Sequence, residues 1–116
     1  MLLADVVATS STVAATRSRK AKVTAISALL AEAGSSPEEL ETVTAYVGGS
    51  LRQRRTGLGW RGLSSLPPPA TAPSLTVLEV HEAFEALSSL AGAGSQAART
   101  AAVAELFGRA TAEEQT

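Results

Sequence analysis

The sequence contains no cysteine and a single histidine. These two features exclude disulfide bridges, thiolate metal sites and metal clusters built on several histidines. Aromatic residues make up only 3% of the 116 residues, and no apolar run approaches the length needed to cross a bilayer. The N-terminus also lacks the basic region and the long apolar region of a signal peptide, which predicts a cytoplasmic protein.

Hydrophobic residues are nevertheless abundant, at 45% of the chain, and many of them are alanine. Alanine favours helix and buries little area per residue, so the core should consist of closely packed helices. A chain of this length forms one small domain or a piece of one. The composition therefore predicts an all-α fold, a small multi-helix bundle of antiparallel helix pairs.

Apolar spacing and helix-start signals divide the chain into three parts. We expect a first helical subunit over 1–66, a proline-rich connector over 67–74 and a second helical subunit over 75–116. An amphipathic helix is predicted over 2–15, and the best-supported helix is predicted over 76–91. Capping boxes are expected at Ser36–Glu39, Thr76–Glu79 and Thr111–Glu114, with Leu75 and Val80 forming a hydrophobic staple. The third start signal stands close to the last residue, which predicts an incomplete domain.

Side-chain environments also follow from this spacing. In the first helical subunit, Val23, Ile26, Leu30 and Ala33 continue the helical spacing, and this stripe should face the core. Tyr46 should pack inside as well. Trp60 is expected in the core rather than stacked on a base. His81 lies among glutamates and is expected at the surface, and the helix after Ser95 should turn Ala98, Ala102, Leu106 and Phe107 inward.

Charge is unevenly distributed along a chain of net charge −1. Residues 1–61 hold eight basic and five acidic groups, whereas residues 62–116 hold two basic and six acidic groups. The first basic block contains Arg17 and Arg19. Either the helix breaks near residues 16–18, or Arg19 emerges from a packed face toward a ligand, the alternative being a solvated basic turn. The asymmetry hints at an anionic partner for the first half.

A second basic block contains Arg52, Arg54 and Arg55 and is interrupted by Gly57 and Gly59. Arginines separated by glycines suit phosphate contacts made by side chains and backbone alike. This block is therefore a candidate DNA-binding segment.

A glycine corner follows the helix predicted over 76–91. Gly92 and Gly94 can adopt positive φ, and Ser95 is expected to be the N-cap of the next helix. The amides at a helix start form an anion site, around which Gln96 and Arg99 could close. The alternative is a plain turn between two helices.

Catalytic patterns are missing from the sequence. It contains no nucleophile–histidine pair, no phosphate-binding loop of the form GxxxxGK[ST], and no lysine within a K-x-D-G pattern. As it stands, this chain should bind rather than react.

An ordered set of motifs resembles the N-terminal region of bacterial ATP-dependent DNA ligases, especially those of actinobacteria. In chain order the motifs are T-R-S-R, L-R-Q-R-R-x-G-x-G-W, L-P-P-P, L-T-V-x-E-V, A-G-A-G-S-Q and L-F-x-R-A-T-x-E-E-Q. The resemblance implies a truncated helical DNA-binding domain. It would grip duplex or nicked DNA through the phosphate backbone, without sequence specificity, during replication, repair or recombination.

The same resemblance implies a division of labour. The adenylated lysine lies beyond Thr116, so this segment should be inactive alone and hold no cofactor, while ATP and Mg²⁺ bind the catalytic domains of the parent ligase. Arg19 is implied as a backbone contact and the corner with Gln96 and Arg99 as a phosphate cradle. Two alternatives stay open. One is a helical protein-interaction module without a nucleic acid role, and a weaker one is a helix-turn-helix regulator.

Overall fold

Local signals in the sequence set most helix boundaries in the computed structural model, which describes residues 1–34 and 36–116, with Trp60 and Arg61 described by their backbones alone. The helices are α1 (Leu3–Ala14), α2 (Arg19–Glu32), α3 (Pro37–Val47), α4 (Val77–Ser88), α5 (Ser95–Gly108) and α6 (Ala112–Gln115), with a 3₁₀ helix η1 (Trp60–Leu63) between α3 and α4. No strand occurs in the described residues, and the predicted all-α class is confirmed.

Capping explains where several helices begin. The Thr76 and Thr111 hydroxyls each accept a hydrogen bond from the backbone amide three residues on. The carboxylates of Glu79 and Glu114 in turn accept from the backbone amides of Thr76 and Thr111, so both predicted capping boxes are confirmed. The box predicted at Ser36 forms only in part. Its hydroxyl accepts from the Glu39 amide, but the Glu39 carboxylate instead pairs with the terminal ammonium of Met1 at 2.9 Å.

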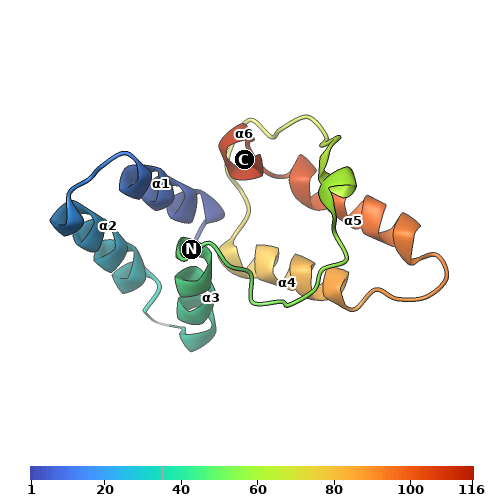
Figure 1. Cartoon of the computed structure of the whole chain (residues 1–116), viewed down its shortest axis with the longest axis horizontal. Coiled ribbons are helices and arrows are strands. Elements are labelled where there is room, and N and C mark those ends of the chain that lie inside the picture. The colour runs from blue at the N-terminus through green and yellow to red at the C-terminus, as the bar shows by residue number, and fades with distance from the viewer. Residues whose placement is uncertain (35) are drawn as a thin grey trace.

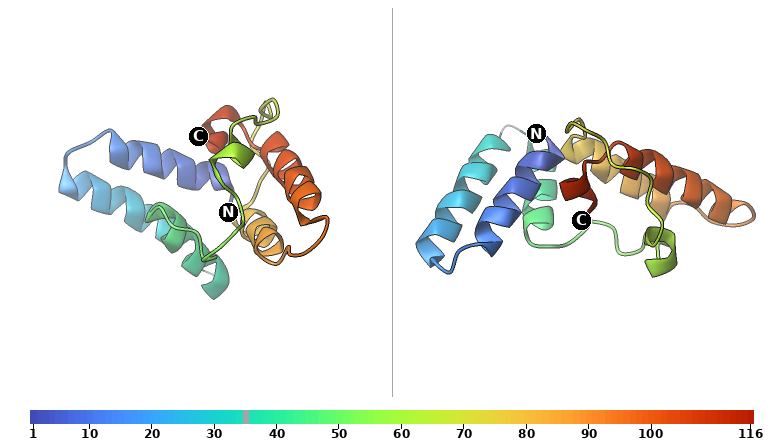
Figure 2. Two further views of the ribbon diagram at one scale, coloured as in Figure 1. Left: turned by 45° about the vertical axis from the view of Figure 1, so that its right-hand side comes forward. Right: turned by 90° about the horizontal axis from the view of Figure 1, so that it is seen from above.

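The helices form an elongated body with extents of 50 × 29 × 23 Å. Figure 1 shows the α1–α2 hairpin at one end, joined to α3, and the antiparallel pair of α4 and α5 at the other. The views in Figure 2 place the short α6 between these halves, where it packs against α1. The predicted arrangement in antiparallel pairs is thus present.

Backbone bonds from the start of the chain tie the two halves together. The Leu3 amide donates to the Leu75 carbonyl at 2.8 Å, and the Val77 amide donates to the Met1 carbonyl at 2.9 Å. The proline-rich stretch is held in a similar way, because the Ala70 amide donates to the Ala110 carbonyl at 2.8 Å. The boundaries of the three predicted parts remain a prediction.

Two clusters of small aliphatic residues form the core. The first joins α1, α2 and α3 and includes Val77 of α4, and the second joins α4 and α5. Leu75 and Val80 lie together in the second cluster, as the predicted staple requires. Tyr46 is half-buried and contacts both clusters.

Two core predictions were wrong at particular positions. Val23 is 57% exposed, because the α1–α2 hairpin extends beyond α3 and its outer end has no cover (Figure 1). Leu29 is buried on α2 instead. On α5, Ala98 is exposed and Val103 is buried. The helix predicted over 76–91 also ends earlier, at Ser88. No helix in the described part is long and apolar enough to span a bilayer.

Candidate nucleic-acid interface

The first basic cluster lies at the turn between α1 and α2. The helix does break there, and the Ser18 hydroxyl caps α2 by accepting from the Ala21 amide at 3.1 Å. Arg17 lies in the turn and Arg19 is the first residue of α2, and both side chains are exposed. Within the described residues, neither makes an ion pair. We call this cluster the basic tip; its members are Arg17, Arg19, Lys20 and Lys22.

Arg52 behaves differently, because its guanidinium is bonded inside the protein. Its Nη1 donates to the Thr42 hydroxyl at 3.1 Å and lies 3.2 Å from Nε2 of His81. Its Nη2 pairs with the Glu41 carboxylate at 3.3 Å. Arg52 thus joins the loop after α3 to both α3 and α4. We call this set of four residues the polar hub.

His81 was predicted at the surface, and this prediction was wrong. The side chain is only 6% exposed. Val77, one turn earlier on α4, is fully buried, so the same helix face carries His81 inward. The imidazole meets Arg52 on one nitrogen and the Gln53 amide on the other, at 3.2 Å each. These partners lie 28 and 29 positions away in the sequence, so helical spacing alone could not reveal them.

Arg54 and Arg55 follow on the same loop and are exposed. Neither forms an ion pair with any residue that the structure describes. Because Gln53 holds the preceding position against α4 through His81 and the Glu85 carboxylate, the two arginines project from an anchored segment. The prediction for Trp60 concerns a side chain outside the described residues.

The glycine corner before α5 forms as expected, with one correction. Gly92 and Gly94 have φ values of +83° and +80°, which strain any residue with a side chain. Gly94, and not Ser95, occupies the N-cap position, and no side chain among the described residues caps the first turn. Ser95 becomes the first helical residue because both glycines are used in the turn.

Arg99 lies one turn into α5 and folds back over this corner. Its Nη2 donates to the Leu90 carbonyl at 3.2 Å, and its Nη1 donates to the Gln96 side chain at 3.4 Å. The guanidinium packs on Gly57, where an added Cβ would lie 2.6 Å from Nε. That Nε is buried without a partner among the described residues. Gln96 and Arg99 are therefore together at the corner, as predicted.

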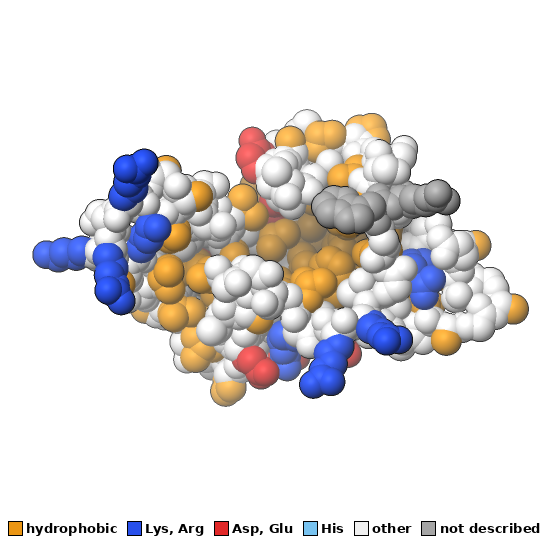
Figure 3. Space-filling model, viewed as in Figure 1, with side chains coloured by type: hydrophobic (Ala, Val, Ile, Leu, Met, Phe, Trp, Pro, Cys, Tyr) orange, Lys and Arg blue, Asp and Glu red, His pale blue; other side chains and the backbone are white. Residues whose placement is uncertain are grey.

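The arginines do not converge into a single patch. Figure 3 shows Lys and Arg side chains at the α1–α2 end of the face and again along the edge near α3 and α4. The interface residues predicted from the sequence therefore fall into three groups. They are Arg17 and Arg19 of the basic tip, the loop with Arg54 and Arg55, and the corner with Gly92, Gly94, Ser95, Gln96 and Arg99, while Arg52 belongs to the polar hub.

Burial raises the pKa of Tyr46 to about 12, and the Arg52 guanidinium acts in the opposite direction. The pKa of Glu79 is lowered, chiefly by the hydrogen bond from Arg109 at 2.8 Å and then by the Thr76 amide. In the described part of the chain, no three His, Asp or Glu side chains gather in a way that could hold a metal ion.

Comparison with known proteins confirms the resemblance suggested by the motifs. A probable DNA ligase of Nocardioides sp. is 73% identical over 118 residues, which cover 99% of this chain and 23% of the relative. A probable DNA ligase of Kineococcus radiotolerans is 62% identical over 99% of this chain and 23% of its own length. DNA ligase B of Mycobacterium tuberculosis is 49% identical over 100% of this chain and 23% of its own.

These matches locate the chain within longer proteins. It corresponds to an N-terminal portion of bacterial DNA ligases and spans 23% of the length of the relatives described above. No family model matches the chain, and no solved structure matches it.

Proposed function

We propose that this chain, similar over its whole length to part of bacterial DNA ligases, is the DNA-binding segment of an ATP-dependent ligase. In this proposal it grips the phosphate backbone of duplex DNA around a nick. Sealing is carried out by catalytic domains elsewhere in the parent protein, which acts in the cytoplasm during replication, repair or recombination.

The observation that carries the proposal is the exposure of unpaired basic side chains at separated points of the molecule. Arg17 and Arg19 stand at one end of a body 50 Å long, and Arg54 and Arg55 project from a loop between α3 and η1. Duplex DNA carries about one phosphate charge per 1.7 Å of its axis. A duplex as long as the protein therefore carries enough phosphates to contact both groups of arginines at once, which a small anionic ligand cannot do.

The corner before α5 supplies a second kind of contact. Its first turn has no side-chain cap, so amides at the positive end of the helix can point at a phosphate oxygen. Arg99 and Gln96 lie beside them. Contacts to phosphate fix the position of a protein on DNA without reading its sequence. The proposed binding is therefore non-specific.

ATP and Mg²⁺ are assigned to other parts of the parent ligase. The residues of this chain do not fit either group, since the sequence offers no phosphate-binding loop and no K-x-D-G lysine. The described carboxylates do not gather into a set of metal ligands. We therefore expect no covalent adenylate when the chain is incubated with labelled ATP and Mg²⁺, and a labelled band would contradict this assignment.

Binding to a fluorescent nicked duplex, measured by anisotropy at several salt concentrations, tests the proposal. If about four phosphate contacts release counterions, a plot of log K against log salt concentration should have a slope of about −3.6. A slope near zero would indicate binding without phosphate contacts. That result, or failure to bind both in this chain and in the full-length ligase, would favour a protein-interaction module instead.

A further inference from the structure

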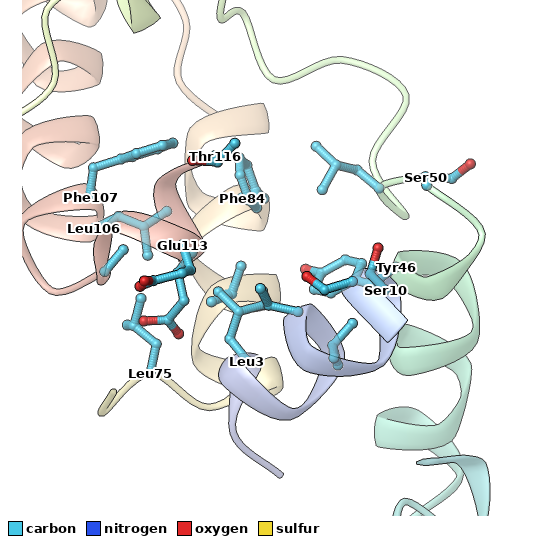
Figure 4. A pocket seen from close by; sticks show the side chains of 18 residues that line it. Leu3, Ser10, Tyr46, Ser50, Leu75, Phe84, Leu106, Phe107, Glu113 and Thr116 are labelled. Atoms are coloured by element: carbon cyan, nitrogen blue, oxygen red, sulfur yellow. The ribbon is translucent and has the colours of Figure 1, made fainter. Parts of the chain in front are cut away.

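The loop that carries Arg54 and Arg55 has little apolar packing where it leaves α3. Figure 4 shows Tyr46 of α3 and Ser50, at the start of this loop, on one side of an apolar groove. The groove has a volume of about 550 Å³, and Leu51, which also lines it, is 41% exposed. Contacts between apolar side chains therefore do little to hold the start of the loop in place.

Polar side-chain contacts hold the loop instead. Among the described residues, every hydrogen bond or ion pair that joins residues 51–56 to a helix is made by the side chain of Arg52 or Gln53. Both of these side chains contact His81, Arg52 through Nη1 at 3.2 Å from Nε2 and Gln53 through Nε2 at 3.2 Å from Nδ1. One buried imidazole is thus the shared partner of the two residues that directly precede the exposed arginines.

The chemistry of these two contacts sets the protonation state that the ring needs. A guanidinium has only N–H donors, and the Gln53 amide is oriented by Glu85, whose carboxylate accepts from the same Nε2 that lies near the ring. A neutral imidazole has a lone pair that accepts from one of these donors, whereas the doubly protonated ring has none. Protonation also places a second positive charge 3.2 Å from Arg52 Nη1, which like-charge repulsion opposes. The protonated ring therefore keeps neither bond.

The charged and titratable groups around the ring decide what protonation does to the loop. From the loop, α3 and α4 these groups are Arg52, Glu41, Tyr46 and Glu85. On α5, which also packs against α4, Arg109 pairs with Glu79 and Arg99 bonds to a backbone carbonyl. Glu85 lies one turn after the ring on the same helix face and is the acceptor that a protonated ring can reach. Pairing of the ring with Glu85 displaces the Gln53 amide.

We propose that His81 is a pH-dependent positioning residue for the DNA contact of Arg54 and Arg55. With a neutral ring the polar hub holds the loop, and with a protonated ring both contacts of the ring are lost and the loop is released. Histidine is the side chain that commonly changes charge between about pH 5 and 8. The inference deepens the proposed function and rests on it where DNA is concerned, because it names what controls one of the phosphate contacts.

NMR of this chain between pH 7.5 and pH 5 measures the release of the loop without DNA. The sequence has one histidine, so a protein made without a histidine tag gives a single imidazole signal that reports protonation. The heteronuclear NOE of the Arg54 and Arg55 amides reports the mobility of the loop. We expect this NOE to fall below about half of its value at pH 7.5, with the same midpoint as the ring. Far-ultraviolet circular dichroism checks that the helices stay folded.

His81→Gln is the matched variant, because its amide oxygen accepts a hydrogen bond and does not titrate in this range. In this variant the NOE of the two loop amides should not change with pH. The inference is overturned if the loop of the unaltered chain keeps its order while the ring is protonated. It is also overturned if the loop is released at a different midpoint, or only when the helices unfold. Should His81→Gln fail to fold, the two midpoints in the unaltered chain still decide the question.

The consequence for DNA is measured as the affinity for a nicked duplex at one fixed salt concentration. Acidification adds positive charge and by itself strengthens binding to a polyanion, whereas release of the loop weakens it. Because only the fraction with a neutral ring has the loop in place, we expect the affinity to fall about tenfold one pH unit below the midpoint. Arg54→Gln/Arg55→Gln should show no such fall, since its loop contacts are already missing. A rise in affinity of the unaltered chain, or an equal fall in the double variant, would contradict the inference.

The two experiments separate this inference from the proposed function. Failure to bind nicked DNA at any pH would overturn the proposed function and the DNA part of the inference, while the NMR midpoints would still decide whether His81 holds the loop. DNA binding with the expected salt dependence, but with neither loop order nor affinity following the ring, would overturn the inference alone.

Discussion

The basic tip and the polar hub both contain arginine from short basic blocks of the sequence, but the two regions hold it in different ways. Arg19 stands at the start of α2 with its side chain in solvent. Arg52 bonds to Thr42, His81 and Glu41 across three segments. An arginine at the tip is available to a ligand, whereas Arg52 holds the loop after α3 in place. Residue type and clustering therefore do not by themselves identify a phosphate contact.

The largest difference between the two regions is expected when each arginine is replaced in turn. Arg52→Ala should lower the free energy of unfolding by about 2 kcal/mol, because His81 Nε2 loses its partner and the Thr42 hydroxyl keeps only its bond to the Glu38 carbonyl. Arg19→Ala should change it by less than about 0.5 kcal/mol, since the side chain is exposed and unpaired. Urea unfolding followed by circular dichroism measures both. Equal stabilities of the two variants would contradict the distinction.

A substitution at Gly57 tests whether the Arg99 guanidinium is packed against the protein, as that of Arg52 is, or lies in solvent, as that of Arg19 does. Its φ is +74°, and an added Cβ would lie 2.6 Å from the Arg99 guanidinium. Gly57→Ala should therefore cost about 2 kcal/mol, from backbone strain and the displaced arginine. Gly49→Ala is the matched control, because its φ is also positive, at +82°, and an added Cβ there meets no atom within 4 Å. Similar unfolding curves for the two variants would show that Arg99 is not seated on Gly57.

The stability of the protein at alkaline pH tests the buried position of Tyr46, whose hydroxyl is affected by the Arg52 charge. Burial raises the pKa of Tyr46 to about 12, whereas the unfolded side chain ionises near pH 10. The unfolded state thus loses the proton first, and the free energy of unfolding should fall by about 1 to 2 kcal/mol as the pH rises through this range. Tyr46→Phe should remove this loss and change stability little near pH 7, because the hydroxyl bonds to none of the residues that the structure describes.

The Arg52 charge acts on the same hydroxyl. It lowers the pKa of Tyr46 against the larger effect of burial, so Arg52→Ala should move that pKa further up. Ultraviolet difference spectra of tyrosinate formation measure the shift. An unchanged titration in a folded Arg52→Ala variant would show that the guanidinium does not act on the Tyr46 hydroxyl.

Local chemistry explains which features could be predicted from the sequence. The boxes at Thr76 and Thr111 form because both partners lie within four residues. The box at Ser36 forms only in part because Glu39 finds a distant partner, the terminal ammonium. The prediction that His81 lies at the surface was wrong because its partners are also distant in the sequence. Its neighbours come from a loop that is remote in the sequence, and spacing along one helix carries no information about them.

The features of the candidate site also fall into those set by local sequence and those set by tertiary contacts. The break before Arg19, which was one of the open alternatives, and the predicted turn at Gly92 and Gly94 are both local, and both form. The bonds from Arg52 to residues of α3 and α4 depend on tertiary packing between segments that are distant in the sequence. No spacing rule reveals that a side chain from one basic block will be bonded internally while its neighbours stay in solvent.

The most direct test of the central claim is the salt dependence of nicked-duplex binding in paired variants. Arg17→Gln/Arg19→Gln and Arg54→Gln/Arg55→Gln should each make the slope of log K against log salt less negative by about 1.8, because each removes two phosphate contacts. Arg109→Gln, which loses a charge already paired with Glu79 at 2.8 Å, should leave the slope unchanged. If both double variants keep the original slope, or if Arg109→Gln reduces it equally, the exposed arginines are not the grip on DNA.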